Sequence, residues 1–546
     1  MRKHVPVPIS AGATRMEDNM KRKMLNRLMA ASIAAIMTVS MAGCGGNADQ
    51  PASSGDQTSG DTQANAGDQT GGATQPDTAE PGSSEAQTET TEEEDLTPEV
   101  RIDPNTGEPF DLGGMEIIIA DWWTGEPEDP KTDFQAAQRE YREWLQETYN
   151  FTMVQKNYAG WGWGEGSIGE AFVQAATSGS DENIIYVLTN SAATAADVSQ
   201  GLMYDLSKLD GDVIDLSAEK WQTNGEVNSW KVDDAVYCFC AGPSEPRGGL
   251  YFNKTVLKDA GIDPETIYDM QLNGEWTWDA WVDIMKEVQR DTDNDGQNDV
   301  FGCVQNNGGM VYMCVRSNGG QLVTKNSDGT YTMTADSDAV REALHFAIDT
   351  VTNNYFLNYG NEEGTNWEDY KNLFMSGKAA FMFDEAYCAY EGGWLTGQKP
   401  VEVNGVTLDQ SVDYGFVMFP KGPKGDNVTN KNNNLFCMPA SYSDEKARQI
   451  MFAYDVWTED VPGYEGYYEL LDNLYGGMKD TRSVDETIDM MTTRGVDDWH
   501  SIVPNFNPND DFLWKLGVGE DVDAILEQNL PAWQTAVDEF NASLKK

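Results

Sequence analysis

Residues 248–254 constrain the fold of this chain more than any other stretch, because they predict a strand that runs directly into a helix. Gly-Gly-Leu-Tyr-Phe has the apolar character of a short buried strand, and Asn253 is a residue type that caps helix N-termini. A short apolar stripe and a glycine stop at Gly261 follow. The preceding segment 243–249 is rich in turn residues, and strand and helix patterns lie on both sides of it. We therefore expect the chain to cross here between two lobes of α/β structure.

Length and charge limit the kinds of protein that this chain can be. A chain of 546 residues is too long for one hydrophobic core, so we expect two or more compact bodies. Its formal net charge of -54 would repel nucleic acid and anionic membrane surfaces, so no nucleic-acid partner is expected. Only three histidines occur, His4, His345 and His500, which leaves little room for a histidine-based zinc site or catalytic triad.

The N-terminus has the layout of an export signal. A basic stretch after Met20 precedes an uncharged apolar run over residues 28–41, which is too short for a convincing membrane span. We interpret residues 1–43 as a leader whose true start is Met20. The ending Ala42-Gly43-Cys44 resembles a bacterial lipobox, so we expect Cys44 to be lipidated, for example with palmitate, and to hold an exported protein at the outer face of the cytoplasmic membrane. The alternative is an ordinary signal peptide followed by a chance cysteine.

A spacer follows the leader. Between residues 45 and 100 there is no lysine or arginine and almost no aliphatic residue, while Gly, Ser, Thr, Gln, Asp and Glu abound. Such a segment cannot bury enough apolar surface to offset its loss of conformational entropy on ordering. We therefore predict a disordered acidic linker over residues 44–100, which keeps the folded part away from the membrane.

The first folded region alternates strand and helix patterns. Residues 115–120, 151–156 and 183–188 are typical of strands, and the segments that begin near 132 and 168 are typical of helices, so we expect an α/β sheet. Ligands of such sheets collect beyond the carboxyl ends of the strands. Indole rings beside Asp or Asn suit the apolar faces and hydroxyl edges of a sugar, although some of these indoles could instead be core residues. The candidate ligand residues here are Asp121, Trp122, Trp123, Trp161, Trp163 and Asn190.

An acidic loop in the second half has the spacing of a calcium site. Oxygen-bearing side chains alternate over residues 291–299 around Gly296, which stands at the sixth place of the loop. The twelfth place, where an EF-hand has Glu, is Gly302. The loop is therefore either a structural calcium site or a plain acidic turn. The candidate ligands are Asp291, Asp293, Asp295, Gln297 and Asp299.

Four segments form an ordered set of motifs: Gly-Leu-Tyr-Phe-Asn-Lys at 249–254, Ala-Gly-Ile-Asp-Pro at 260–264, Trp-Thr-Trp-Asp-Ala-Trp at 276–281 and Phe-Met-Ser-Gly-Lys-Ala-Ala-Phe at 374–381. These motifs resemble those of bacterial extracellular solute-binding proteins of family 1, the maltose-binding-protein-like proteins of ABC transporters. The resemblance implies an α/β, two-lobed, periplasmic-binding-protein-like (type II) fold with a hinge and an interlobe cleft. It implies a first lobe of residues 112–247 with about 432–475, and a second of 248–431 with about 476–546.

The resemblance also implies a function. Residues just past the strand at 379–383 would line the cleft, namely Asp384, Glu385, Tyr387 and Trp394. The ligand would be a carbohydrate, the partner would be the permease of an ABC importer, and the protein would be a monomer without enzymatic activity. Two alternatives remain open at this point: a surface glycosidase that uses paired carboxylates, and a subunit that presents ligand to a sensor. Six cysteines follow Cys44 and lack metal-ligand spacing; Cys303 and Cys314 are the nearest pair that export could oxidise.

Overall fold

In the computed structural model of the protein, residues 99–546 belong to one compact unit. The structure describes residues 98–544 except 190, 224–229, 233, 297, 306–308, 354–355, 359–368, 391–394, 396–400, 404–405, 409–411, 432–433, 468, 507 and 509–520. The predictions for the leader, Cys44, the linker, Asn190, Gln297 and Trp394 therefore lie outside the described residues. Within the described part, no helix is long and apolar enough to cross a membrane.

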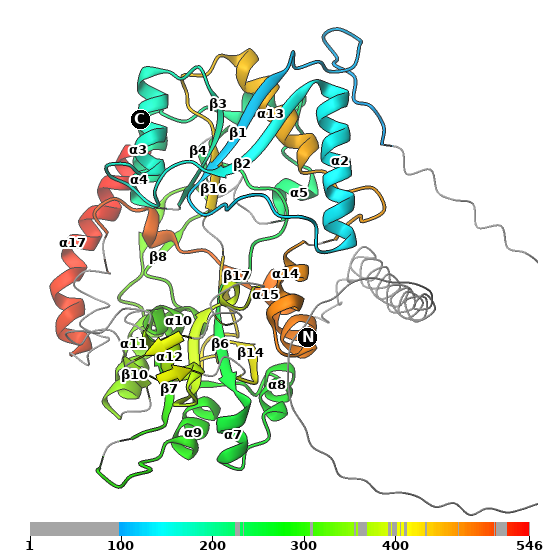
Figure 1. The fold of residues 1–546 in the computed structure, drawn as a ribbon. Helices are drawn as coiled ribbons and strands as arrows, with labels where there is room; N and C mark the ends of the chain where they lie inside the picture. The colour runs from blue at the N-terminus through cyan, green and yellow to red at the C-terminus, as the bar shows by residue number, and fades with distance from the viewer. Residues whose placement is uncertain are drawn as a thin grey trace, which may run out of the picture. The chain divides into compact units, whose positions relative to one another are not determined.

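The first lobe is built on a four-stranded sheet in the order β16-β3-β1-β2 (Figure 1). β1 (Met115–Asp121), β2 (Phe151–Asn157) and β3 (Asn183–Thr189) are parallel, and β16 (Asn434–Cys437) runs antiparallel to β3. Helices α2 (Asp133–Tyr149) and α3 (Ile168–Ser178) connect the parallel strands, and α13 (Asp444–Trp457) follows β16. The hydroxyl groups of Thr132 and Ser167 cap the two connecting helices by accepting hydrogen bonds from backbone N–H groups. The predicted alternation of strand and helix is confirmed.

A segment ahead of β1 belongs to this lobe as well. Arg101 donates to Asp455 at 2.5 Å, and Asp103 accepts from Arg448 at 2.8 Å. Each of these contacts joins the segment to α13. Phe110 stacks on a phenylalanine of the same helix with ring centroids 3.6 Å apart. The sequence placed the start of the lobe at residue 112. The polar residues before it resemble the linker in composition, but two arginine–carboxylate contacts and one aromatic stack fix them to the lobe.

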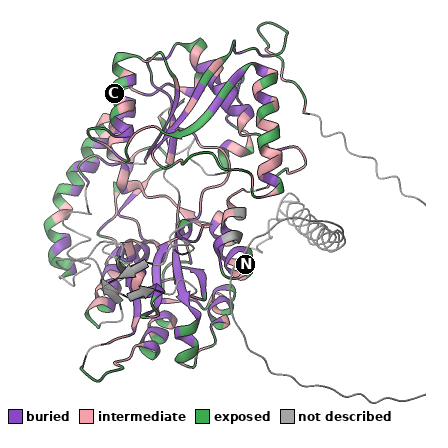
Figure 2. Ribbon diagram, viewed as in Figure 1, coloured by how far each residue is buried: buried purple, intermediate pink, exposed green. Residues whose placement is uncertain are grey.

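The second lobe is built on a five-stranded sheet in the order β10-β7-β11-β6-β14. β6 (Gly248–Asn253) lies antiparallel to β11 (Ala379–Glu385) and to β14 (Tyr414–Met418), whereas β7 (Phe301–Gln305) is parallel to β11 and to β10 (Phe356–Asn358). Every residue of β6 and β14 is buried, and Figure 2 shows these strands in purple. The helices of this part are α7 (Lys254–Asp259), α8 (Glu265–Leu272), α9 (Trp278–Val288), α10 (Gly309–Ser317), α11 (Asp338–Thr352) and α12 (Asp369–Met375).

The unit predicted around residues 248–261 is present. Asn253 caps α7 by accepting from two backbone N–H groups, and Gly261 has a positive φ of 83° after the helix ends. The two glycines that open β6 are required by close packing: a Cβ on Gly249 would lie 2.4 Å from the ring of Phe416 on the neighbouring strand. Gly249 therefore allows Phe416 of β14 to lie directly against β6.

The remaining elements are short, apart from one long helix near the C-terminus. α14 and α17 follow α13, and the apolar side chains of Leu470 and Leu474 on α14 pack in the core of the second lobe. The chain has therefore returned to this lobe before residue 476, the place predicted from the sequence. These elements are α4 (Ala192–Ser199), η1 (Leu206–Leu209), α5 (Glu219–Gln222), β4 (Lys231–Val232), β5 (Ala235–Val236), β8 (Val323–Lys325), β9 (Tyr331–Met333), η2 (Ala386–Ala389), β12 (Val401–Val403), β13 (Val406–Leu408), β15 (Thr429–Asn430), α14 (Leu470–Gly477), η3 (Ser483–Ile488), α15 (Asp489–Thr493), β17 (Gly495–Val496), η4 (Trp499–Ile502) and α17 (Val522–Ser543).

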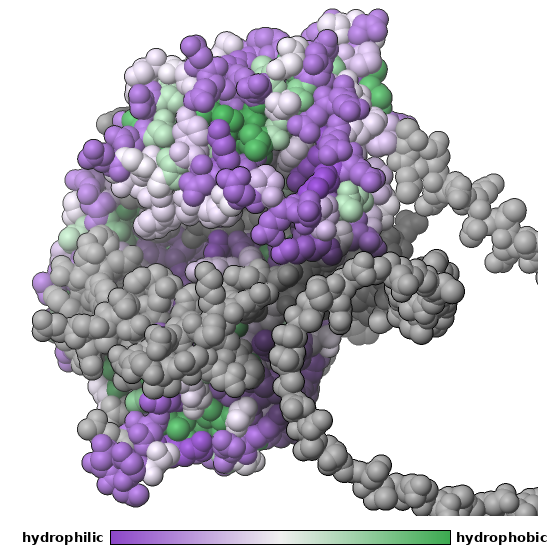
Figure 3. All heavy atoms as spheres, viewed as in Figure 1, coloured by the Kyte–Doolittle hydropathy of each residue, from purple (hydrophilic) through white to green (hydrophobic). Residues whose placement is uncertain are grey.

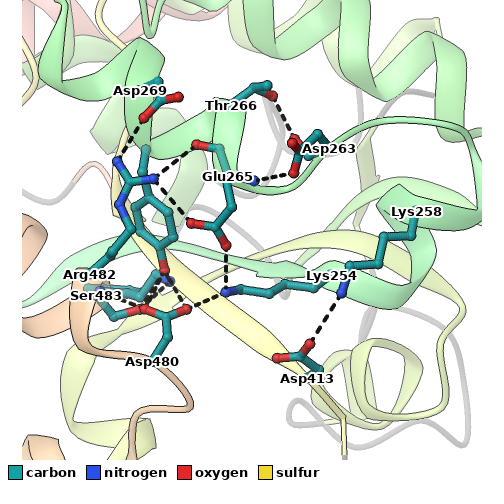
Figure 4. Close-up of polar contacts among 12 residues, drawn as sticks. Lys254, Lys258, Asp263, Glu265, Thr266, Asp269, Asp413, Asp480, Arg482 and Ser483 are labelled. Carbon is teal, nitrogen blue, oxygen red and sulfur yellow. Dashed lines mark hydrogen bonds and ion pairs between the residues drawn. The ribbon is translucent and has the colours of Figure 1, made fainter.

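The open edge of β14 is closed by side chains rather than by another strand. The N–H of Phe416 donates to the hydroxyl of Ser483 at 3.0 Å, and the N–H of Met418 donates to the amide oxygen of Gln271 at 2.7 Å. Unpaired edge groups invite pairing with other chains, so these two bonds protect the sheet. Ser483 belongs to a polar network around Asp480 (Figure 4). That network ties the segment after α14 to the second sheet.

The cysteines of the folded part are not bonded to one another. Cys238, Cys240, Cys303, Cys314, Cys388 and Cys437 are free thiols in the structure. Cys303 on β7 and Cys314 on α10, the pair considered from the sequence, are fully buried. Burial raises the pKa of both thiols, which makes them weak nucleophiles.

Candidate ligand-binding site at the crossings

The two lobes are joined by chain crossings that lie side by side. The N–H of Gly248, at the start of β6, donates to the side-chain oxygen of Asn430 on β15 at 2.9 Å, and the hydroxyl of Thr429 donates to the carbonyl of Gly248 at 3.1 Å. β15 also pairs in parallel with β17, which brings a third segment to the same place. The predicted crossings near residues 247–250 and 430–436 are therefore in contact with each other.

In both lobes, a crossing segment meets the sheet at the carboxyl end of a strand. In the first lobe, β16 enters beside the carboxyl end of β3, because Asn434 pairs with Thr189. In the second lobe, Gly248 pairs with Glu385 at the carboxyl end of β11. The loops that follow β1, β2, β3 and β11 thus lie at the edges where the crossings enter and leave. These loops carry the candidate residues predicted from the sequence.

On the first lobe, Asp121 holds its loop in place. It is fully buried, and its carboxylate accepts from the N–H groups of Trp123 at 3.1 Å and Thr124 at 3.0 Å. It also accepts from the hydroxyl of Thr124 and, at 2.8 Å, from the side-chain amide of Gln155. Both carboxylate oxygens are therefore engaged within the lobe. Contact between Asp121 and a ligand stays a prediction.

The four candidate tryptophans differ in exposure. Trp123 is 46% exposed and Trp161 is 69% exposed, which is unusual for so large an apolar side chain. Trp122 packs edge-on against Trp123 with ring centroids 4.7 Å apart and contacts the hydrophobic core. Trp163 covers Gly169, where a Cβ would lie 2.3 Å from the indole. Trp123 and Trp161 are consequently the two indoles with the most surface available to a ligand.

On the second lobe, Glu385 and Tyr387 lie beside an arginine that the sequence did not nominate as a ligand residue. Arg247 donates to Glu385 at 2.8 Å and contacts Glu245 at 3.1 Å, and its guanidinium lies over the ring of Tyr387 at 5.6 Å from the centroid. The hydroxyl of Tyr390 donates to Glu245. Burial lowers the pKa of Arg247, but the two carboxylates outweigh burial and raise it overall. In the sequence, the one feature that could have pointed to Arg247 is its position in the turn-rich segment 243–249, where the chain crosses between the lobes.

Asp384 serves a different purpose from its neighbour Glu385. It is buried, accepts from the hydroxyl of Tyr370 at 2.6 Å and lies 3.5 Å from the ammonium of Lys371. These contacts attach the end of β11 to α12. The alternation of side chains along a strand therefore sends Asp384 into the lobe and leaves Glu385 near the crossing.

The face drawn in Figure 3 is hollowed between the upper and lower parts of the described structure. The described surface visible in and around this hollow is largely hydrophilic, with apolar side chains more frequent elsewhere on the same face. Partly exposed aromatic rings, one arginine and carboxylates are the groups that can stack on and hydrogen-bond to a polar, hydroxylated ligand.

The acidic loop brings three of its predicted ligands together. Asp291, Asp293 and Asp299 each place a carboxylate oxygen within 4.8 Å of the others. The loop turns at Asn294 and Gly296, which have positive φ angles of 64° and 93°. Asp291 also accepts from the N–H groups of both turn residues, at 2.6 and 2.8 Å. Asp295 is exposed and stands outside this three-carboxylate group.

Several solved structures are similar to this chain in fold. The substrate-binding protein Lmo0181 from Listeria monocytogenes, in complex with cycloalternan, is 16% identical with a TM-score of 0.50 and covers 79% of this chain and 99% of its own. The GacH receptor of Streptomyces glaucescens, solved with acarbose, has the same values. UgpB from Mycobacterium tuberculosis, in complex with glycerophosphocholine, is 16% identical with a TM-score of 0.51 and covers 78% of this chain and 99% of its own. At these identities the likeness concerns the fold.

The fold and its crossings define a hinged, two-lobed binding protein. The family of bacterial extracellular solute-binding proteins matches residues 132–453, and the chain belongs to this family. No curated protein sequence matches the chain. The family resemblance and the two-lobed α/β fold predicted from the sequence are confirmed.

Proposed function

We propose that this protein captures a carbohydrate, in particular an oligosaccharide, between its two lobes and delivers it to the permease of an ABC importer. The observation that carries the proposal is the placement of Arg247, Glu385 and Tyr387 beside the crossings of a solute-binding protein. The exposed indoles of Trp123 and Trp161 stand after strands of the other sheet. A ligand held by both groups would favour closure of the hinge.

The similar structures support a carbohydrate as the ligand class. Lmo0181 was solved with cycloalternan and GacH with acarbose, whereas UgpB was solved with glycerophosphocholine. The two exposed indoles can stack on the apolar ring faces of a sugar. Stacking and hydrogen bonding do not require a reactive group, so we propose binding without catalysis.

The proposed setting is the outer face of the bacterial cytoplasmic membrane. Cys44 would carry the lipid, and the acidic linker would give the folded part freedom to reach a permease. We propose that the protein acts as a monomer, because one chain supplies both lobes of the site.

A thermal-shift screen of the purified protein against mono- and oligosaccharides tests the proposal. A ligand that binds only the native state raises the melting temperature, with a stabilisation of about 2.7 kcal/mol at a hundredfold excess over Kd. We expect at least one oligosaccharide to raise the melting temperature and to be recovered intact by chromatography. Recovery of a cleaved sugar would replace the proposal with a surface glycosidase, and no shift with any sugar would contradict it. Association of the loaded form with a receptor rather than with a permease would indicate a sensor subunit.

Calcium in the acidic loop is a separate proposal. Three converging carboxylates and the predicted ligands Asp295 and Gln297 offer the hard oxygen atoms that Ca²⁺ prefers. After treatment with chelator, addition of Ca²⁺ should raise the melting temperature, and the double substitution Asp291→Asn and Asp293→Asn should abolish this rise. Asp283→Asn, on the exposed face of the neighbouring helix α9, is the matched control and should leave it unchanged. If the melting temperature does not respond to Ca²⁺, the loop is a plain acidic turn and not a calcium site.

A further inference from the structure

A polar pocket of about 790 Å³ lies away from the candidate residues at the crossings. It is lined by residues 127–131, by one face of α2, by Trp457 at the end of α13 and by Asn473 on α14. α2 and α13 belong to the first lobe, while α14 contacts η2 of the second. Its volume is in the range of small-molecule sites. We refer to it as the α2 pocket.

Arg142 is the distinctive group of the α2 pocket. Of the three cations that line it, Lys131 pairs with Glu128 at 3.0 Å and Arg139 pairs with Asp129 at 3.6 Å. Arg142 makes no ion pair with any described residue, although the chain has 91 acidic residues against 37 basic ones. Its guanidinium carbon lies over the indole of Trp457, 4.6 Å from the ring centroid.

The hydrogen bonds of Arg142 leave most of its donors unused. One terminal nitrogen donates to the side-chain oxygen of Gln138 at 3.1 Å, and the buried Nε has no partner. Glu469, at the start of α14, accepts from the amide of Gln138 at 3.1 Å. An arginine can donate five hydrogen bonds, and a partly buried one gains from a planar acceptor such as a carboxylate.

The other polar groups of the pocket also offer donors. The side-chain oxygens of Gln135 and Gln146 accept from the backbone N–H groups of Lys131 and Met153, at 2.8 and 3.0 Å. Within the described part of the chain, their amide nitrogens donate to no residue, and both residues line the pocket. The exposed Glu143 is the one lining carboxylate without a described ion pair, and solvent can satisfy it. A ligand rich in acceptors and carrying a carboxylate therefore fits this set.

We propose that the α2 pocket binds a sugar acid, with its carboxylate on the terminal nitrogens of Arg142 and its hydroxyl groups on the amides of Gln135, Gln146 and Asn473. The site is distinct from the proposed ligand site at the crossings and does not depend on it. Because the pocket draws residues from both lobes, a ligand bound there would also stabilise the arrangement of the lobes that forms it.

D-Glucuronate, with D-glucose as the neutral control, tests the proposal by saturation-transfer NMR and titration of the full-length protein. We expect saturable binding of glucuronate with a Kd of about 1 mM or tighter and at least tenfold weaker binding of glucose. Arg142→Met should weaken glucuronate binding at least tenfold. Arg139→Gln, which changes a paired cation of the same pocket, should change it less than threefold. Asn473→Ala, on the opposite wall of the pocket, should also weaken glucuronate binding. This variant tests the proposal if the Arg142 variant does not fold.

The proposal would be overturned by the absence of saturable glucuronate binding at about 10 mM, by equal binding of glucose, or by unchanged binding in both the Arg142 and Asn473 variants. Glucuronate binding that is lost in Trp123→Ala but kept in Arg142→Met would place the ligand at the crossings and would also overturn it. A failure of the neutral-oligosaccharide screen would leave the α2 pocket unaffected, so the two proposals are tested separately.

Discussion

Replacing Asp480 with alanine is expected to lower the free energy of unfolding by about 3–5 kcal/mol. The carboxylate lies 2.6 Å from the ammonium of Lys254, whose side chain is only 8% exposed. It also accepts from the hydroxyl of Tyr268 at 2.9 Å and from the N–H of Ser483 at 2.8 Å (Figure 4). Without it, the buried ammonium keeps one carboxylate partner among the described residues, Glu265 at 3.1 Å, and the side chains that close the edge of β14 lose their anchor.

The matched control for Asp480 is Asp413, which is drawn in the same view. Its carboxylate lies 3.6 Å from Lys258, and both side chains are at least half exposed, so Asp413→Ala should cost less than about 1 kcal/mol. Urea denaturation followed by circular dichroism measures both variants. A loss in the Asp480 variant no larger than that in the control would show that the network does not stabilise the second lobe.

Asp197 is expected to make the free energy of unfolding fall as the pH rises. The substitution Asp197→Asn should remove the part of this pH dependence that comes from the carboxyl. Asp197 on α4 is 5% exposed, and one of its carboxylate oxygens is buried without a hydrogen-bond partner. Burial raises the pKa of this carboxyl from 3.8 to about 7. Because the pKa is higher in the folded state, this carboxyl contributes stability that is fully present below the unfolded-state pKa of 3.8. That stability is lost as the pH rises through the folded-state pKa of about 7. Between pH 5 and 8.5 the loss is about 2–3 kcal/mol.

The measurement is the free energy of unfolding at pH 5, 7 and 8.5 for the wild type and two variants. The difference between the wild type and Asp197→Asn should change by about 2–3 kcal/mol over this range. Asp181→Asn, which changes an exposed carboxylate of the same lobe, should keep the wild-type profile. Parallel profiles for the wild type and the Asp197 variant would mean that this carboxyl is ionised or solvated in the native state.

The fold was predictable because its strands and caps are local signals. The strand at 115–121 carries the apolar run Ile-Ile-Ile-Ala at 117–120, and Asn253 and Thr277 cap helices where their side chains predict it. Residues 101–111 were missed, because their attachment depends on Asp455, Arg448 and Phe452 of α13, more than 340 residues away. No local pattern carries such long-range pairing.

The candidate site was predictable only as a set of loops. The sequence identified the segments after β1 and β11, since ligands of α/β sheets collect there. It could not tell that Asp121 and Asp384 turn into their lobes while Trp123 and Glu385 stay accessible, because burial depends on packing against distant elements. Arg247 and the α2 pocket were missed for the same reason: each is defined by partners from separate parts of the chain.

Calorimetric titration of the oligosaccharide that gives the largest thermal shift tests the central claim most directly. The wild type should bind it saturably, with one site for each chain. Trp123→Ala on the first lobe and Glu385→Gln on the second should each weaken binding at least tenfold, about 1.4 kcal/mol. Val154→Thr, an exposed position on β2, should not change the Kd. Unchanged affinity in both site variants, or no binding of any oligosaccharide by the wild type, would contradict carbohydrate capture between the lobes.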